Sequence, residues 1–345
     1  MRKKILVTGS EGYIGTVLAN ELIKRDYQVT GLDTNFFKDS HIKSGKRNYK
    51  LIKKDIRKLD GLDLHEYFAV IHLAALSNDI TGDIQPVLTK DINFFSTVKL
   101  AKLAKKHGVK RFLFSSSCSI YGIAKNGTVN EKSPINPVTP YAKAKIASER
   151  DLRKLADSGF CVGLLRNSTV YGYSPNFRND LVVNNLVTCA LAINKLTIKS
   201  DGTPWRPLID VWDLSNIFIA FLQAGKNQIN SKVFNIGFNE NNLQVRDIAH
   251  LIKKQLPSCE IVFTGEHGND VRTYKVNFDK FHKAFPQIRK MWSLTKSIEN
   301  MISKLRENNF NSEDYYSGRY TRLAVLNRLL SKKIIDKSFY WNHEN

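Results

Sequence analysis

The sequence predicts an α/β protein built on a doubly wound parallel sheet, with a smaller mixed α/β domain towards the C-terminus. Short apolar runs rich in β-branched residues alternate with segments of helical periodicity through the first half of the chain. The chain begins with a predicted strand, a glycine-rich turn and a helix. The length of 345 residues suits one large α/β unit or two domains. Strands that alternate with helices imply right-handed crossovers and therefore a parallel sheet.

The opening unit carries three glycines in the spacing G-x-x-G-x-x-G. The apolar run Ile5–Val7 predicts a buried strand, and apolar residues at helical spacing predict a helix over Thr16–Lys24. Between them, Gly9 permits a tight turn, Gly12 lets the backbone approach a pyrophosphate, and Gly15 lets the helix pack on the strand. The helix N-terminus then faces the phosphates. The pattern predicts a dinucleotide site of the Rossmann type; the alternative is an ordinary glycine-rich turn.

The second strand is predicted over Tyr27–Leu32 and is followed by Asp33, 18 residues beyond Gly15. A carboxylate there can accept hydrogen bonds from the adenosine ribose and would repel a 2′-phosphate, which favours NAD over NADP. Basic residues nearby could neutralise a phosphate if their loop folds back, namely Lys38, Lys43, Lys46 and Arg47. The alternative role of Asp33 is to end the strand in a turn.

Three further strands are predicted before the middle of the chain. One lies within residues 48–57 and ends at Asp55 and Ile56; the next covers Ala69–Leu73 and runs into Ala74 and Ala75. The fifth strand covers Arg111–Ser115, after a long helix over Asp83–His107 that contains Asn93. His72, a lone histidine in an apolar strand, is expected to be packed structure rather than an acid–base group.

Hydroxyl residues gather after the fifth strand, in Ser115–Gly122, at the edge where open α/β sheets bind ligands. A loop over Asn126–Pro140 leads to a predicted helix over residues 141–157. Tyr141 and Lys145 share one face of that helix because they are four residues apart.

This pairing has a chemical rationale. For a tyrosine to act as a base, its pKa must fall from near 10 towards neutrality, which takes about 4 kcal/mol of preferential stabilisation of the phenolate. A lysine ammonium and a positive nicotinamide ring supply such a field, and Ser117 can hydrogen-bond the reacting oxygen. The alternative is an ordinary helical turn, since Y-x-x-x-K occurs by chance.

With these motifs in this order, the chain resembles the extended short-chain dehydrogenase/reductases, and within them the nucleotide-sugar epimerase/dehydratase family that includes UDP-galactose 4-epimerase. The resemblance extends to about residue 285. Besides the glycine turn and Tyr141-x-x-x-Lys145, it rests on HLAA at 72–75, SSSCSIYG at 115–122, LLRNSTVYG at 164–172, VVNNLV at 182–187, DGTPWRPLIDVWDL at 201–214 and VFNIG at 233–237.

The resemblance implies roles for individual residues. Tyr141 would be the acid–base, Lys145 would hold the nicotinamide ribose and lower the tyrosine pKa, and Ser117 would position the sugar oxygen. The implied NAD-binding residues are Gly9, Gly12, Tyr13, Ile14, Gly15, Asp33, Asp55, Ile56, Leu73, Ala74, Ala75, Asn93, Ser115, Tyr141 and Lys145. The implied substrate-binding residues are Ser117, Cys118, Ser119, Thr169, Asn185, Arg206 and Arg272. Arg206 suits a pyrophosphate because a guanidinium binds it through two parallel hydrogen bonds; its alternative is a surface arginine.

The sequence also departs from the family pattern. The sugar 4,6-dehydratases carry Asp and Glu directly after the catalytic hydroxyl residue, and here Cys118 and Ser119 stand there, which disfavours 4,6-dehydration. The epimerase's sugar-proximal Asn is replaced by Thr169, and its base-proximal Arg by Arg272 or by residues within 266–270. Cys118 could alter the room for the sugar or be a small packed residue.

The sequence of the second half of the chain predicts the helices and strands of the smaller domain. Helices are expected over Leu181–Asn194, Leu243–Gln255 and Leu294–Leu305, and strands over Leu196–Ile198, Pro207–Val211, Lys232–Ile236 and Glu260–Phe263. We expect residues 1–175 and 213–249 to form the NAD-binding domain, and residues 176–212 and 250–310 to bind the nucleotide sugar. The tail 311–345 is too aromatic for disorder, and a closing helix is expected at 319–331.

Composition limits the classes of function. The net charge of +21 permits nucleic-acid or membrane-surface binding, but the lysines of Lys99–Arg111 follow the solvated face of a helix, so neither partner is expected. Four cysteines without a C-x-x-C pair suit a reducing cytoplasm and argue against a zinc site. No run is long and apolar enough to span a membrane, and no metal is expected.

The expected protein is a cytoplasmic, homodimeric, NAD-dependent enzyme that acts on a nucleoside-diphosphate sugar, at C4, through a 4-keto intermediate. A 4-epimerase is favoured. A one-way NAD(P)-dependent 4-ketoreductase or dehydrogenase is the alternative, and a non-catalytic cofactor-binding protein or a nucleic-acid binder stays open behind it. The dimer is expected from the helices at 83–107 and 141–157, which resemble the pair that forms the family's four-helix interface.

Overall fold

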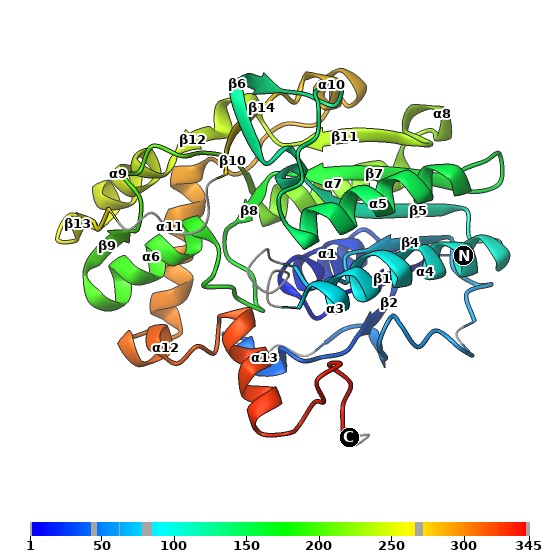
Figure 1. The fold of residues 1–345 in the computed structure, drawn as a ribbon, viewed down its shortest axis with the longest axis horizontal. Coiled ribbons are helices and arrows are strands. Elements are labelled where there is room, and N and C mark those ends of the chain that lie inside the picture. The colour runs from blue at the N-terminus through cyan, green and yellow to red at the C-terminus, as the bar shows by residue number, and fades with distance from the viewer. Residues whose placement is uncertain (1, 43–46, 62, 78–84, 266–271, 343–345) are drawn as a thin grey trace.

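A computed structural model of the chain describes residues 2–42, 47–61, 63–77, 85–265 and 272–342. Its centre is a parallel sheet of seven strands (Figure 1), as the sequence predicts. In spatial order the strands are β11 (Lys232–Ile236), β7 (Cys161–Asn167), β5 (Arg111–Ser117), β4 (Ala69–His72), β1 (Lys4–Thr8), β2 (Gln28–Asp33) and β3 (Lys50–Lys53). The order reverses between β1 and β4, and a doubly wound sheet binds ligands at this switch point.

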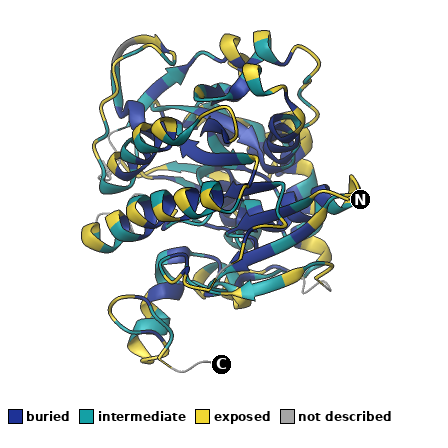
Figure 2. Cartoon of the chain, turned by 90° about the vertical axis from the view of Figure 1, so that its right-hand side faces the viewer, coloured by how far each residue is buried: buried dark blue, intermediate teal, exposed yellow. Residues whose placement is uncertain are grey.

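Helices cover both faces of the sheet. Leu18 and Leu22 of α1 (Tyr13–Lys24) and Phe218 of α7 (Val211–Gln223) form one apolar core with Ile5 and other side chains of that face. On the other face, α4 (Ser96–Lys106) and α5 (Pro140–Leu155) pack on the second core. Figure 2 shows the strands buried in the middle of the molecule and exposed residues along the outer sides of the helices.

The long helix predicted over Asp83–His107 is three consecutive helical segments. Residue 83 lies outside the described residues. The helical path begins with α3 (Pro86–Lys90), widens to a π turn over Asp91–Phe95 and continues as α4. Two other boundaries differ slightly from prediction: β3 ends at Lys53, two residues before Asp55, and α1 begins at Tyr13 rather than Thr16.

A third apolar core lies beyond the sheet, among α6 (Val182–Ile193), α9 (Val245–Gln255) and α11 (Leu294–Glu307). Small sheets flank it. One contains β8 (Thr169–Tyr171), β10 (Trp205–Asp210) and β12 (Asn242–Gln244), and another pairs β9 (Lys195–Ile198) with β13 (Glu260–Phe263). Within the predicted return segment 213–249, β11 joins the large sheet, whereas β12 and α9 belong with the small sheet and third core. The domain boundaries themselves stay a prediction.

One predicted loop is wrong in part. Residues 126–140 were expected to be loop, but β6 (Ile123–Val129) occupies the first of them and pairs in parallel with β14 (Thr273–Val276). Its partner lies far along the chain, so no local pattern marks the strand.

The remaining short helices are α8 (Lys226–Ile229), α10 (Asp279–Ala284) and α12 (Ser312–Tyr316). The predicted closing helix is α13 (Arg322–Ser331), and its Leu326 packs into the core beneath α4 and α5. In Figure 1 α13 lies between the two parts of the molecule, below the switch point.

Candidate active site

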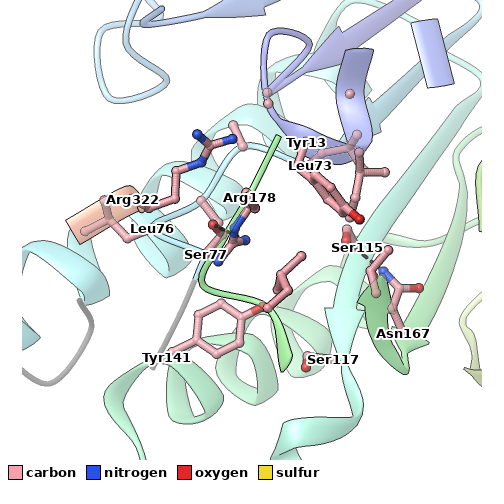
Figure 3. Close-up of a pocket in the computed structure, with 18 of the residues that line it drawn as sticks. Tyr13, Leu73, Leu76, Ser77, Ser115, Ser117, Tyr141, Asn167, Arg178 and Arg322 are labelled. Atoms are coloured by element: carbon pink, nitrogen blue, oxygen red, sulfur yellow. Dashed lines mark hydrogen bonds between the residues drawn. The ribbon is translucent and has the colours of Figure 1, made fainter. Parts of the chain in front are cut away.

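A cavity of about 590 Å³ opens at the carboxyl ends of the central strands. The glycine turn after β1 lines one end of it, and Ser117 and Tyr141 line the other (Figure 3). The segment after β8 and the first residue of α13 complete the wall. The cavity therefore contains the switch point and reaches the smaller sheets.

The glycine turn leaves the space that a dinucleotide needs. Gly9 has φ of +73°, and a Cβ atom there would lie 2.8 Å from the amide nitrogen of Ala74. A Cβ atom at Gly15 would lie 2.0 Å from the carbonyl oxygen of Gly9. A Cβ atom at Gly12 would lie 3.1 Å from the same carbonyl oxygen, a tight contact that needs only a small shift, and the side chain would project into the cavity that Gly12 lines. Tyr13 and Ile14 begin α1 and line the cavity, so the residues fit a dinucleotide diphosphate at this helix N-terminus.

Asp33 lies at the end of β2 and lines the same cavity. Its carboxylate accepts hydrogen bonds from the backbone N–H groups of Glu11 at 3.0 Å and Asn35 at 2.7 Å. Burial nevertheless raises the pKa of Asp33 to about 6. Arg47, one of the basic residues considered for neutralising a 2′-phosphate, is paired with the Glu11 carboxylate at 2.7 Å. Lys43 and Lys46 lie outside the described residues. The geometry favours a ribose with free hydroxyls.

At the end of β4, Leu73, Ala74 and Ala75 line the cavity as expected. Asn93 does not line it. Its amide group is hydrogen-bonded to the backbone N–H and C=O of Leu76, at 2.8 and 3.0 Å, so it fixes the loop that lines the cavity. The implied direct contact of Asn93 with the cofactor is therefore corrected to an indirect role.

Asp55 and His72, both predicted from the sequence, have side chains that are held by different partners. Asp55 and Ile56 line the cavity, and the Asp55 carboxylate is paired with Arg57 at 2.7 Å. The His72 ring lies between the hydroxyl groups of Thr8 and Thr97, and burial lowers its pKa to about 3. His72 is a neutral, packed histidine, as expected.

Ser117 and Tyr141 lie at the far end of the cavity (Figure 3), and Lys145 lines the cavity beside Tyr141. The Lys145 ammonium donates to the carbonyl oxygen of Ser115 at 2.6 Å and lies 5.5 Å from the centre of the Tyr141 ring. Thr139 caps α5 by accepting from the Ala142 N–H, which places Tyr141 in the first turn. Burial lowers the pKa of Lys145 to about 7, and the charge of Glu149 opposes that shift.

All the residues predicted to bind the substrate line this cavity except Cys118. Ser119, Thr169, Asn185, Arg206 and Arg272 line it. Cys118 does not: its thiol donates to the carbonyl oxygen of Arg166 at 3.1 Å, and burial raises its pKa. The implied substrate contact of Cys118 is thus corrected to a small packed residue.

The two predicted substrate arginines are neighbours. The Arg206 guanidinium donates to the backbone carbonyl of Arg272, and also to that of Trp205 at 3.0 Å. Asn185 is held by a hydrogen bond from its side chain to the carbonyl oxygen of Asn179 at 3.1 Å. The first two contacts hold the Arg206 guanidinium beside the backbone of Arg272, and both residues line the cavity.

Sequence reasoning missed several lining residues. Arg178 is paired with Asp180 at 2.9 Å and donates to the Ser77 hydroxyl at 3.1 Å. Asn167 donates to the Ser115 hydroxyl at 2.9 Å, and Arg322 enters from α13. The polar run Arg178-Asn179-Asp180 before a helix was a usable signal for Arg178. Nothing near Arg322 in the sequence marks a site.

A doubly wound sheet with an open glycine turn at its switch point, and a Ser–Tyr–Lys set across the cavity, defines an enzyme that uses a nicotinamide dinucleotide. The family described as "NAD dependent epimerase/dehydratase family" matches residues 5–237. The chain belongs to this family, and its cofactor is NAD.

Individual relatives agree with this class. The chain is 30% identical to UDP-glucose 4-epimerase of Bacillus subtilis (strain 168) over 261 residues, which cover 68% of this chain and 76% of that protein. It is 26% identical over 324 residues to dTDP-D-glucose 4,6-dehydratase of Homo sapiens, covering 89% and 91% of the two chains. The fold is similar to UDP-glucuronic acid 4-epimerase from Bacillus cereus, solved with UDP-glucuronic acid and NAD, at a TM-score of 0.77, 28% identity and 88% and 99% coverage.

The protein is therefore an enzyme of the nucleotide-sugar epimerases and dehydratases. Among its described residues, no helix is both long and apolar enough to cross a bilayer.

Proposed function

We propose that the protein is an NAD-dependent 4-epimerase of a nucleoside-diphosphate sugar, acting through a 4-keto intermediate. The observation that carries the proposal is the meeting of Ser117, Tyr141 and Lys145 at the end of the cavity that Arg206 and Arg272 also line. This arrangement offers acid–base groups for a hydroxyl and cations for a diphosphate within one space.

The chain's own residues account for the proton steps. Tyr141 takes the proton of the sugar hydroxyl, and the Lys145 cation favours the phenolate form that can do so. Ser117 donates a hydrogen bond to the sugar oxygen and holds it near Tyr141. The chemistry that bound NAD would supply is reversible transfer of a hydride from and to the sugar carbon. Tyr141 gives its proton back as the second hydroxyl forms, so no net oxidation or reduction occurs.

The residues after Ser117 support epimerisation over elimination of water. Elimination needs a proton donor and acceptor beside the sugar, and here Cys118 is turned away and Ser119 is a hydroxyl residue. Among the described lining residues the carboxylates are Asp33, Asp55 and Asp180. Asp33 and Asp55 are on the glycine-turn side, and Asp180 is paired with Arg178. A human relative is a 4,6-dehydratase, so the test must separate the two reactions.

The nucleotide half of the substrate is assigned by charge. Arg206 and Arg272 suit a diphosphate because guanidinium groups bind two of its oxygens at once. The B. cereus relative was solved with a UDP sugar, which makes UDP the first nucleotide to try.

The experiment uses the purified chain with no added cofactor. The bound nucleotide is released by denaturation and identified by mass spectrometry, and UDP-, GDP-, CDP- and dTDP-hexoses are then followed by NMR. The expected result is near-stoichiometric NAD and interconversion of two C4 isomers. A product lighter by one water would make the enzyme a dehydratase. Turnover that consumes added NADH or NAD would make it a one-way reductase or dehydrogenase, and either outcome overturns the proposal.

We also propose a homodimer through the face made by α3, the π turn and α5. Val87 of α3 is 83% exposed and Phe95 of the π turn is 52% exposed, and contact with a second copy would bury these two apolar side chains. Sedimentation of the wild type and of a Val87→Glu/Phe95→Glu variant tests this. A monomeric wild type would contradict it.

A further inference from the structure

The C-terminal helix α13 carries Arg322 into the cavity, at the end opposite Tyr141 (Figure 3). Arg322 is 4% exposed. One of its terminal nitrogens, Nη2, donates to the side-chain oxygen of Asn176 at 2.5 Å, and the guanidinium lies 4.3 Å from the centre of the Phe37 ring. The other, Nη1, is buried and has no hydrogen-bond partner among the described residues. A buried charged donor without a partner is costly unless a ligand supplies one.

A second guanidinium faces the same space. Arg178 is 7% exposed and lines the cavity. Burial and the positive charge of Arg178 lower the pKa of Arg322 to about 9. Asp180 is already engaged by two nitrogens of Arg178, at 2.9 and 3.0 Å. The Asp180 and Asp33 carboxylates oppose this shift, but neither is hydrogen-bonded to Arg322 among the described contacts, so the Arg322 guanidinium can still take an anion as a direct partner.

The position of Arg322 indicates which anion. Asn176, its hydrogen-bond partner, also donates to the carbonyl oxygens of Glu11 at 2.7 Å and Phe37 at 3.0 Å. Glu11 directly precedes Gly12, which lines the cavity. Arg322 thus lies beside the glycine turn, on the side where a dinucleotide would place its phosphates.

We propose that Arg322 binds the diphosphate of NAD together with Arg178, and that the C-terminal segment is a built part of the cofactor site. The proposal concerns the cofactor and does not depend on which sugar the enzyme takes. The matched family region ends at residue 237, so this contact lies outside it.

Residues after α13 anchor the C-terminal segment beside the cofactor site. The Trp341 indole donates to the carbonyl oxygen of Thr34 at 3.0 Å, and its ring lies 5.3 Å from that of Phe36. Arg57 donates to the carbonyl oxygen of Ser338 at 2.7 Å and stacks on Tyr340 at 3.9 Å. Thr34, Phe36 and Arg322 line the cavity, so these contacts hold the C-terminal segment beside the cofactor site.

The test compares Arg322→Gln with Arg322→Lys and with Arg328→Gln, which removes the same charge from the same helix outside the cavity. Bound nucleotide is stripped first. Affinities for NADH, ADP-ribose and adenosine are then measured by calorimetry. We expect Arg322→Gln to bind NADH and ADP-ribose roughly 10- to 100-fold more weakly, as for loss of one hydrogen bond to a charged group. Adenosine affinity and Arg328→Gln are expected to match the wild type, with Arg322→Lys in between.

Thermal unfolding separates this role from a structural one. Without nucleotide, Arg322→Gln is expected to be as stable as the wild type or more so, because an uncompensated buried charge is gone. Added NADH is then expected to raise its Tm by less than in the wild type. A lower Tm without nucleotide combined with unchanged affinity for NADH would overturn the proposal. An equal loss for adenosine and ADP-ribose would also overturn it, since the contact would then not be to the diphosphate.

Discussion

The Lys145 ammonium lies 5.5 Å from the centre of the Tyr141 ring, one turn further along α5. The carbonyl oxygen of Ser115 fixes the ammonium from the end of β5, at 2.6 Å. The charge is therefore held between strand and helix, facing the cavity. In the mechanism proposed above, a positive charge at this position would favour the phenolate of Tyr141 over the neutral phenol.

Replacement of Tyr141 by Phe removes the proposed acid–base and keeps the ring. We expect kcat to fall by roughly 10²- to 10⁴-fold, the usual contribution of a general acid–base group, with NADH affinity unchanged. Steady-state kinetics and calorimetry measure the two quantities. Tyr316→Phe is the control, because Tyr316 is 70% exposed and is not among the residues that line the cavity. Activity of Tyr141→Phe near that of the control would remove Tyr141 from the mechanism.

Lys145 makes the stability of the cofactor-free protein depend on pH. Its pKa is about 7 when folded and about 10.4 when unfolded. Between these values the unfolded chain binds the extra proton, so this contribution to the free energy of unfolding rises with pH; below pH 7 the cost of burying the cation is present in full. We expect the stability of the wild type relative to Lys145→Met to rise from pH 7 towards pH 10. Urea unfolding across that range measures it, and a constant difference would contradict it.

The sequence predicts the parts of the site that are local in the chain. The glycine turn, the end of β5 and the Tyr141–Lys145 spacing each fit within a strand–turn–helix unit, so their geometry follows from periodicity and backbone sterics. Arg178 and Arg322 could not be paired in this way, since they meet only when the tail folds back. The pairing of β6 with β14 is non-local for the same reason. The role of Cys118 could not be predicted from the sequence, because one turn of backbone decides whether its thiol faces the cavity or the carbonyl oxygen of Arg166.

Asp33 is expected to make cofactor binding depend on pH. Its pKa of about 6 means that the carboxylate needed to accept ribose hydroxyl groups is lost as the pH falls through 6. NADH affinity should therefore be constant above pH 7 and decrease up to about tenfold per pH unit below 6. Asp33→Asn should flatten this profile and weaken the discrimination against NADPH. An unchanged profile in the variant would assign the titration to another group.

Two alanine substitutions in the glycine turn should behave differently. In Gly15→Ala the new Cβ would lie 2.0 Å from the Gly9 carbonyl oxygen, a backbone clash that we expect to destabilise the fold by several kcal/mol. In Gly12→Ala the new Cβ would lie 3.1 Å from that oxygen, which a shift of a few tenths of an ångström relieves, so we expect a much smaller loss of stability and much weaker NADH binding. Thermal unfolding and calorimetry on both variants test this, and equal loss of stability in both would contradict it.

Arg206 is expected to act in substrate binding through its planar guanidinium. Arg206→Lys keeps the charge but cannot bind two diphosphate oxygens in parallel, so KM for the nucleotide sugar should rise by about tenfold while kcat changes little. Arg246→Lys, at an exposed position on α9, is the matched control. The rise in KM should be the same for all sugars that carry the same nucleotide. The affinity for NADH, which does not involve the substrate diphosphate, should be unchanged. If kcat falls and KM does not, Arg206 contributes in the transition state, and its assignment to the diphosphate is wrong.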